Sequence, residues 1–287
     1  MSGLAQQLLL ERIRALAEAT PEVVGLLVLG SFATGTADEL SDLDVGLYVT
    51  AEALDTFNLR KWLEPVSPVA TIFTNQYAST VLFRNLIRAE IHFGSLAKAN
   101  DWSSMVGLVA YPSLPQVVLL DRTGTLADRV RPLVGRLPPR GAKDGDRELA
   151  ALVDSLLVAD ACRRRGELAR ALAHLSSSHV PLLRLARLAE GAIDEWVAPE
   201  RHVELELSAS AYERFALTTA PLADDQLRAA IAAAWQWGDE LAASAGISLL
   251  DEAMMHAVER RLAPPAPRVR RSRFKARPNP DPHPRLP

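Results

Sequence analysis

Two carboxylates lie near the start of the chain at a spacing that could hold a metal ion. Asp42 and Asp44 are two residues apart at the beginning of an apolar run, 43–49, that predicts a strand. Side chains two apart on a strand point to the same face. Paired carboxylates there would bind Mg²⁺, which prefers oxygen ligands and shares them with phosphate groups. Two such ions about 3.5–4 Å apart can hold the attacking and leaving oxygens of an in-line displacement.

A Gly-Ser pair precedes these carboxylates at the end of another apolar run, 23–29, which predicts a buried strand. Gly30 would let the backbone approach a phosphate closely. Ser31 would add a hydroxyl at the start of a helix, where free N–H groups and the helix dipole favour anions. Each piece alone is common, but the combination between two apolar strands indicates a nucleotide site.

A third carboxylate is expected on a nearby strand. Glu90 is the one acid in the otherwise apolar pattern 89–93. It is a candidate general base toward an acceptor hydroxyl, or a ligand of a second metal. Burial would raise its pKa and nearby Mg²⁺ would oppose that rise, so both roles stay open. His92, two residues on, shares its face and is either a substrate-site residue or a core histidine.

The surrounding pattern predicts an α+β protein. An N-terminal nucleotide-binding domain (1–131) has a mixed sheet flanked by helices, and a Pro/Gly-rich linker (132–145) leads to an all-α helical bundle (146–263). A Pro/Arg-rich tail (264–287) is expected to be disordered. The predicted strands are 23–29, 43–49, 80–83, 89–93 and 117–120. The predicted helices are 4–19, 53–63, 147–165, 167–175, 181–196, 209–215, 223–245 and 249–262, with Pro181 and Pro221 at helix starts.

Composition narrows the class of protein. The 287 residues are 48% hydrophobic and 23% charged, as in a soluble globular protein, and no apolar run reaches the roughly 18 residues of a membrane span. One cysteine, Cys162, and the absence of a signal peptide favour a cytoplasmic protein. Residues 264–287 hold seven Lys or Arg and one Asp, so the formal charge of −3 leaves −9 on the rest, which argues against nucleic acid as partner.

The Gly30-Ser31 to Asp42-x-Asp44 pattern resembles the DNA polymerase β-like nucleotidyltransferase superfamily. Further segments resemble the two-domain lincosamide nucleotidyltransferases, which are similar to aminoglycoside nucleotidyltransferases. Those segments are Tyr48, Asn75-Gln76-Tyr77, residues 85–93, Arg165-Gly166-Glu167 with Ala169-Arg170, and residues 212–220. The resemblance covers about residues 5–262. One departure is Asp42-x-Asp44 itself, because the lincosamide pattern has Asp-x-Glu.

The resemblance implies a five-stranded mixed sheet followed by a helical bundle, and a homodimer. It implies Mg²⁺, ATP or another nucleoside triphosphate as donor, and transfer of AMP to a hydroxyl of a small-molecule antibiotic, a lincosamide first. Arg165 and Arg170 match the pattern and would contact the triphosphate, although a solvated basic face is the alternative. Tyr77 would contact the acceptor.

Three other readings are open. The acceptor could be an aminoglycoside. It could be a protein or tRNA, as for toxin or antitoxin nucleotidyltransferases, although the acidic body argues against tRNA. The chain could also be an inactive nucleotide-binding scaffold, but a binder has no need of the third carboxylate, Glu90.

Overall fold

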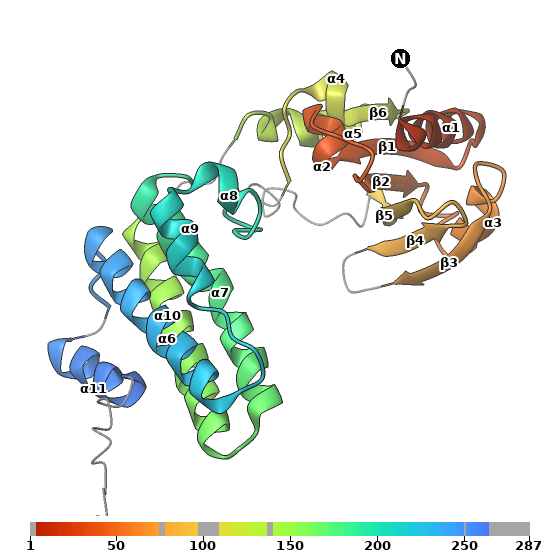
Figure 1. Ribbon diagram of the computed structural model, residues 1–287. Helices are drawn as coiled ribbons and strands as arrows, with labels where there is room; N and C mark the ends of the chain where they lie inside the picture. The colour runs from red at the N-terminus through yellow and green to blue at the C-terminus, as the bar shows by residue number, and fades with distance from the viewer. Residues whose placement is uncertain (1–3, 75–77, 97–108, 137–139, 250, 264–287) are drawn as a thin grey trace, which may run out of the picture. The chain divides into compact units, whose positions relative to one another are not determined.

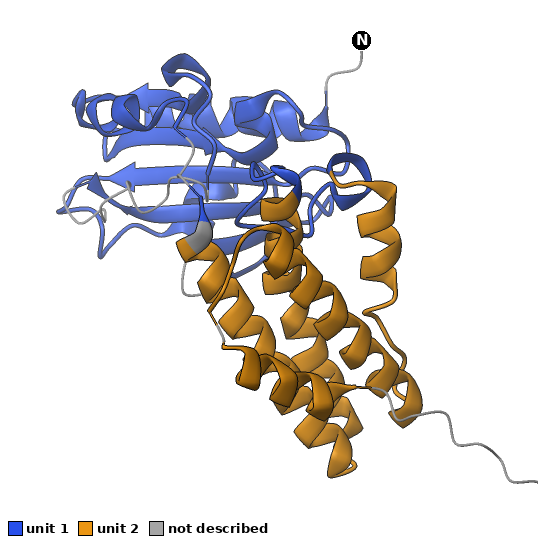
Figure 2. Ribbon diagram, turned by 90° about the vertical axis from the view of Figure 1, so that its left-hand side faces the viewer, with its two compact units in different colours: residues 1–141, 190–206 blue, residues 142–189, 207–287 orange. Residues whose placement is uncertain are grey.

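The computed structural model describes the chain except residues 1–3, 75–77, 97–108, 137–139, 250 and 264–287. The predicted substrate residue Tyr77 and the predicted tail 264–287 lie outside the described residues. The chain forms two compact units (Figure 2). The sheet unit comprises Met1–Gly141 and Glu190–Glu206, and the helical unit comprises Ala142–Ala189 and Leu207–Pro287.

The sheet unit is built on a six-stranded sheet in the order β3-β4-β5-β2-β1-β6 (Figure 1). The strands are β1 (Val23–Leu29), β2 (Leu43–Val49), β3 (Val69–Thr74), β4 (Ser79–Phe83), β5 (Arg88–Ser95) and β6 (Val118–Asp121). β2 and β5 pair in parallel and the other neighbours pair antiparallel, so the sheet is mixed, as predicted. Such a sheet followed by a helical region is an α+β fold.

The central strands are held by burial on both faces. Nearly every residue of β1 and β2 is buried, which fits their continuous apolar sequences. Helix α1 (Ala5–Ala19) packs on β1 and β6 through an apolar stripe that includes Leu9, Ile13 and Ala17. The unit's other helices are α2 (Gly30–Thr34), α3 (Leu59–Leu63), α4 (Leu114–Val117), α5 (Thr125–Val130), the 3₁₀ turn η3 (Arg131–Leu133) and α8 (Val203–Glu206).

The helical unit contains α6 (Ala142–Arg164), α7 (Leu168–Glu190), α9 (Ala209–Ala216), α10 (Asp224–Ser244) and α11 (Glu252–Leu262). α10 packs against α6, α9 and α11. A buried carboxylate, Asp160 on α6, accepts hydrogen bonds from Arg163 and Arg164 and pairs with Arg261 of α11. No helix among the described residues is long and apolar enough to cross a membrane.

Three predictions about elements were wrong. The sheet has six strands instead of five, because β3 was missed: it is an edge strand whose residues are mostly exposed, so its sequence lacks a buried pattern. The predicted helix 53–63 reduces to α3, whose first turn is capped by the side chain of Asn58. The predicted helices 167–175 and 181–196 are one helix, α7 (Leu168–Glu190), so Pro181 lies inside it and does not start a helix. Buried leucines on its flanks, such as Leu175 and Leu185, offset the roughly 3 kcal/mol that an interior proline costs.

Candidate active site

The three predicted carboxylates meet at one end of the β2–β5 pair. Asp44 and Glu90 are direct neighbours across the parallel ladder. Asp42 precedes Asp44 by two residues, so the alternation of the strand brings it to the same face. Neighbouring strands lie about 4.8 Å apart, which places these side chains in one neighbourhood at the strand ends. The sequence had paired Asp42 with Asp44, and the strand register adds Glu90.

A guanidinium that the sequence analysis had not singled out lies among these carboxylates. Arg88, the first residue of β5, forms ion pairs with Asp42 Oδ2 through Nη1 and with Glu90 Oε1 through Nη2. Arg88 and Glu90 are two residues apart on one strand, so both side chains lie on the face that carries Asp44. That spacing was visible in the sequence, but its partner Asp42 lies 46 residues away.

Asp44 is a half-buried carboxylate whose surroundings shift its pKa. Burial first, and then the negative charges of Asp42 and Glu90, raise its pKa to about 6, although His92 and Arg88 act in the opposite direction. A nearby cation would compensate the local negative charge and so stabilise the ionised form of this carboxylate. Carboxylate oxygens are the ligands that a hard divalent cation prefers, and Asp42, Asp44 and Glu90 supply three carboxylates at this strand end.

Gly30 is required next to Asp44 for two separate reasons. Its φ of +60° lies in the left-handed region that favours glycine. A Cβ added at this position would also lie 3.3 Å from Cγ of Asp44 and still closer to its Oδ2. Any side chain at residue 30 therefore displaces the carboxylate. Gly35, at the other end of α2, also has a positive φ, +75°, but a Cβ added there would meet open space.

Helix α2 differs from its expected role. It spans only Gly30–Thr34, five residues, and the macrodipole of so short a helix is small. Ser31, its second residue, is half-buried beside the strand end. The close approach of Asp44 thus explains why residue 30 is a glycine. Phosphate binding by Gly30 and Ser31 stays a prediction.

The loop that leads into Asp42 is tied down at both ends. The Asp38 carboxylate accepts hydrogen bonds from the Ser41 hydroxyl at 2.9 Å and from the backbone N–H of Leu40 at 3.0 Å. Gln6 of α1, only 6% exposed, donates to the carbonyls of Glu39 at 2.8 Å and Ser41 at 3.0 Å. These bonds fix the backbone just before Asp42. No sequence pattern pointed to Gln6, because the contact spans more than 30 residues.

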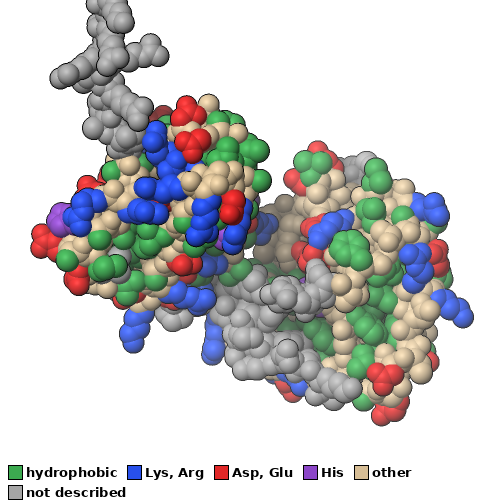
Figure 3. Space-filling model, turned by 90° about the horizontal axis from the view of Figure 1, so that it is seen from below, with side chains coloured by type: hydrophobic (Ala, Val, Ile, Leu, Met, Phe, Trp, Pro, Cys, Tyr) green, Lys and Arg blue, Asp and Glu red, His purple; other side chains and the backbone are tan. Residues whose placement is uncertain are grey.

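The remaining predicted residues are divided between the units. His92 pairs in register with Gly46 of β2, two positions beyond Glu90 on the same face, and its effect on the Asp44 pKa places it near the carboxylates. Arg165 and Arg170 belong to the helical unit and are exposed. Figure 3 shows Lys and Arg side chains gathered on that unit. Arg170 pairs with Glu167 at 3.2 Å. Contact of either arginine with a triphosphate stays a prediction.

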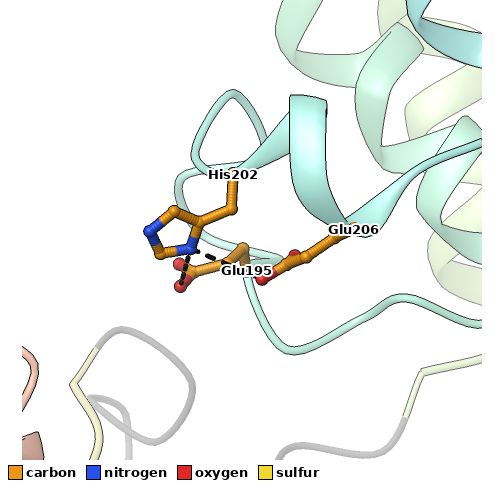
Figure 4. Close-up of side chains that lie close together, drawn as sticks. All are labelled: Glu195, His202 and Glu206. Atoms are coloured by element: carbon orange, nitrogen blue, oxygen red, sulfur yellow. Dashed lines mark ion pairs between the residues drawn. The ribbon is translucent and has the colours of Figure 1, made fainter. Parts of the chain in front are cut away.

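A second group of metal-ligand type lies in the sheet unit (Figure 4). Nδ1 of His202 is 3.4 Å from Glu195 Oε1 and 3.4 Å from Glu206 Oε1. Arg201 pairs with Glu195 at 3.7 Å. Glu195 is thus already paired with a cationic side chain of the protein, and half of the His202 side chain is exposed. These contacts are therefore those of a surface ion-pair network.

Two family models match the chain. Residues 9–98 match the nucleotidyltransferase domain, and residues 143–256 match the lincosamide nucleotidyltransferase-like C-terminal domain. The protein is a nucleotidyltransferase. The first match contains Gly30, Ser31, Asp42, Asp44 and Glu90, together with Arg88. The second contains Arg165 and Arg170.

Several solved structures match the chain, and one of them does so over most of its length. It is the crystal structure of an aminoglycoside 6-adenyltransferase from Bacillus subtilis, with 12% identity and a TM-score of 0.39 over 90% of this chain and 98% of that one. A comparison with curated protein sequences found no match.

We expect Gly30→Ala to lower kcat/KM for the nucleotide by about 10²-fold, because a displacement of about 1 Å at a catalytic group can cost that much. Gly35→Ala is the matched control. Both variants should lose about 1–2 kcal/mol of stability from the left-handed backbone, measured by thermal melts, but only Gly30→Ala should lose turnover. Equal turnover in the two variants would contradict the role of Gly30 beside Asp44.

We expect Asp44→Asn to stabilise the metal-free protein above pH 6. The raised pKa means that the folded state holds a proton that the unfolded state has released between pH 4 and 6, so stability falls as the pH rises through this window. The variant lacks this loss. Its Tm advantage should be absent near pH 4, grow toward pH 6 and stay constant above, at roughly 2–4 °C for each ~1 kcal/mol. A Tm difference that does not change with pH would contradict the assigned environment of Asp44.

Proposed function

We propose that this nucleotidyltransferase transfers AMP from ATP to a hydroxyl group of a lincosamide antibiotic, with Mg²⁺, and releases pyrophosphate. The observation that carries the proposal is the meeting of Asp42, Asp44 and Glu90 at the ends of β2 and β5, inside the part of the chain that matches the nucleotidyltransferase domain. The C-terminal match to a lincosamide nucleotidyltransferase-like domain supports the acceptor class.

Asp42 and Asp44 would hold Mg²⁺. The ion would neutralise the charge that develops on the triphosphate during the displacement. The chain's own contribution is to fix the two carboxylates before the nucleotide arrives: Gly30 leaves room for Asp44, and the bonds to the 38–41 loop fix the backbone before Asp42. A site fixed in advance needs no reorganisation during the reaction.

Glu90 would accept the proton of the attacking hydroxyl at a carboxylate oxygen. It lies beside Asp44 in the ladder, and its side chain is 28% exposed, so an acceptor can reach it. The same position also suits a ligand of a second metal ion, and the two roles differ in what they do to nucleotide affinity. Gly30 and Ser31 would contact the nucleotide, Arg165 and Arg170 the triphosphate, and His92 and Tyr77 the acceptor. A homodimer is part of the same proposal.

The proposal is tested by incubating the purified protein with ATP, MgCl₂ and one antibiotic at a time, and measuring the mass of the antibiotic. We expect clindamycin to gain one AMP, with matching release of pyrophosphate, and streptomycin and kanamycin to stay unchanged. Asp42→Asn should retain less than about a tenth of turnover, a loss of at least ~1.4 kcal/mol in transition-state stabilisation. Adenylylated streptomycin with unchanged clindamycin would replace the lincosamide with an aminoglycoside as acceptor.

We expect Glu90→Gln to lower kcat by about 10²–10⁴-fold, because that is the typical contribution of a positioned general base. The affinity for ATP with Mg²⁺, measured by calorimetry, should stay within about threefold of the wild type. Thermal melts control for folding. If ATP affinity fell together with kcat, Glu90 would be a metal ligand and the base would have to be another group.

A further inference from the structure

We propose that Arg88 is a positioning residue that takes the place of a cation among the carboxylates, and that it makes metal binding depend on the nucleotide. In this view Arg88 must release Asp42 before Mg²⁺ can be held by Asp42 and Asp44. The inference rests on the proposed function of this site and extends it to how the site is regulated.

The first support is geometric. The two terminal nitrogens of one guanidinium bind carboxylates from two different segments, Asp42 just before β2 and Glu90 on β5. A guanidinium presents its N–H groups in a rigid planar fork, so two carboxylates held by one fork are fixed relative to each other. Arg88 therefore keeps the carboxylate cluster assembled when no metal is bound, against the mutual repulsion of three negative charges.

The second support is competition for the same atoms. Oδ2 of Asp42 accepts a hydrogen bond from Arg88, and this oxygen cannot direct the same lone pair at a metal ion. A divalent ion next to Asp42 would also repel the positive guanidinium. Metal and Arg88 thus exclude each other at Asp42, while Arg88 can keep its contact with Glu90.

The third support is that the pair can open. The side chain of Arg88 is 44% exposed and those of Asp42 and Glu90 are 38% and 28% exposed. Ion pairs this exposed are worth little, so a ligand can displace them. The contrast in the same chain is Arg163 with Asp160, where both side chains are less than 10% exposed and the pair is a fixed part of the helical unit.

A nucleotide triphosphate changes this balance. It brings negative oxygens that can bind both the metal and a released guanidinium. Arg88 can therefore exchange Asp42 for a phosphate oxygen and still be paired. Metal affinity should therefore be low for the free protein and higher with nucleotide. By thermodynamic linkage the metal must raise nucleotide affinity by the same factor.

The test measures Mn²⁺ binding by the electron paramagnetic resonance signal of the free ion. The proteins are the full-length wild type, Arg88→Gln, Arg88→Met, Arg88→Lys and Arg84→Gln, with and without a non-hydrolysable ATP analogue. Arg84→Gln removes the same charge four residues away, on an exposed side chain. Circular dichroism and thermal melts confirm folding, and either neutral variant suffices if the other does not fold.

We expect Arg88→Gln and Arg88→Met to bind Mn²⁺ about three- to tenfold more tightly than the wild type without nucleotide, and to show a smaller gain on adding nucleotide. Arg88→Lys and Arg84→Gln should stay within about twofold of the wild type. Unchanged or weaker Mn²⁺ binding by both neutral variants would overturn the role of Arg88 and leave the proposed function standing. Failure of the wild type to bind Mn²⁺ even with nucleotide would overturn both.

Discussion

Three like charges lie together at one end of two paired strands, and the surrounding sheet has to hold them there against their repulsion. Parallel pairing of β2 with β5 sets Asp44 beside Glu90, and strand alternation adds Asp42. Three carboxylates so close repel one another, and the raised pKa of Asp44 reports this repulsion together with its burial. The arrangement is stable only because a buried sheet holds the backbone and because cations compensate the charge.

The sheet unit supplies that rigidity from residues far from the site. β1 and β2 are buried almost throughout, so a shift of their register by one residue would exchange their side chains between two covered faces and disrupt close packing on both. The fixed register sets the close approach of Gly30 to Asp44. Gln6 of α1 holds the loop before Asp42 in place through its two hydrogen bonds to backbone carbonyls. Packing therefore determines the geometry, and exposed groups such as Arg88 remain able to move.

The sequence predicted the parts of the site that depend on short spacing. Asp42, Asp44 and Glu90 follow from two-residue alternation in apolar strands, and the two-part α+β fold follows from a change in hydrophobic period. Arg88 and Gln6 were missed because their partners lie 46 and more than 30 residues away, where only tertiary structure decides contact. The prediction at Pro181 failed for the opposite reason. Proline locally favours the start of a helix over its interior, but burial of one face of α7 outweighs that preference.

The proposed function requires that Asp42 and Asp44 hold a divalent metal ion. Anomalous diffraction from crystals soaked with Mn²⁺ and a non-hydrolysable ATP analogue tests it most directly, because manganese can be located independently of any activity. We expect a strong anomalous peak within about 2.5 Å of carboxylate oxygens of both Asp42 and Asp44, with Arg88 withdrawn from Asp42. A structure in which manganese binds Glu195, His202 and Glu206 instead, and Arg88 still bridges Asp42 and Glu90 with the nucleotide bound, would contradict it.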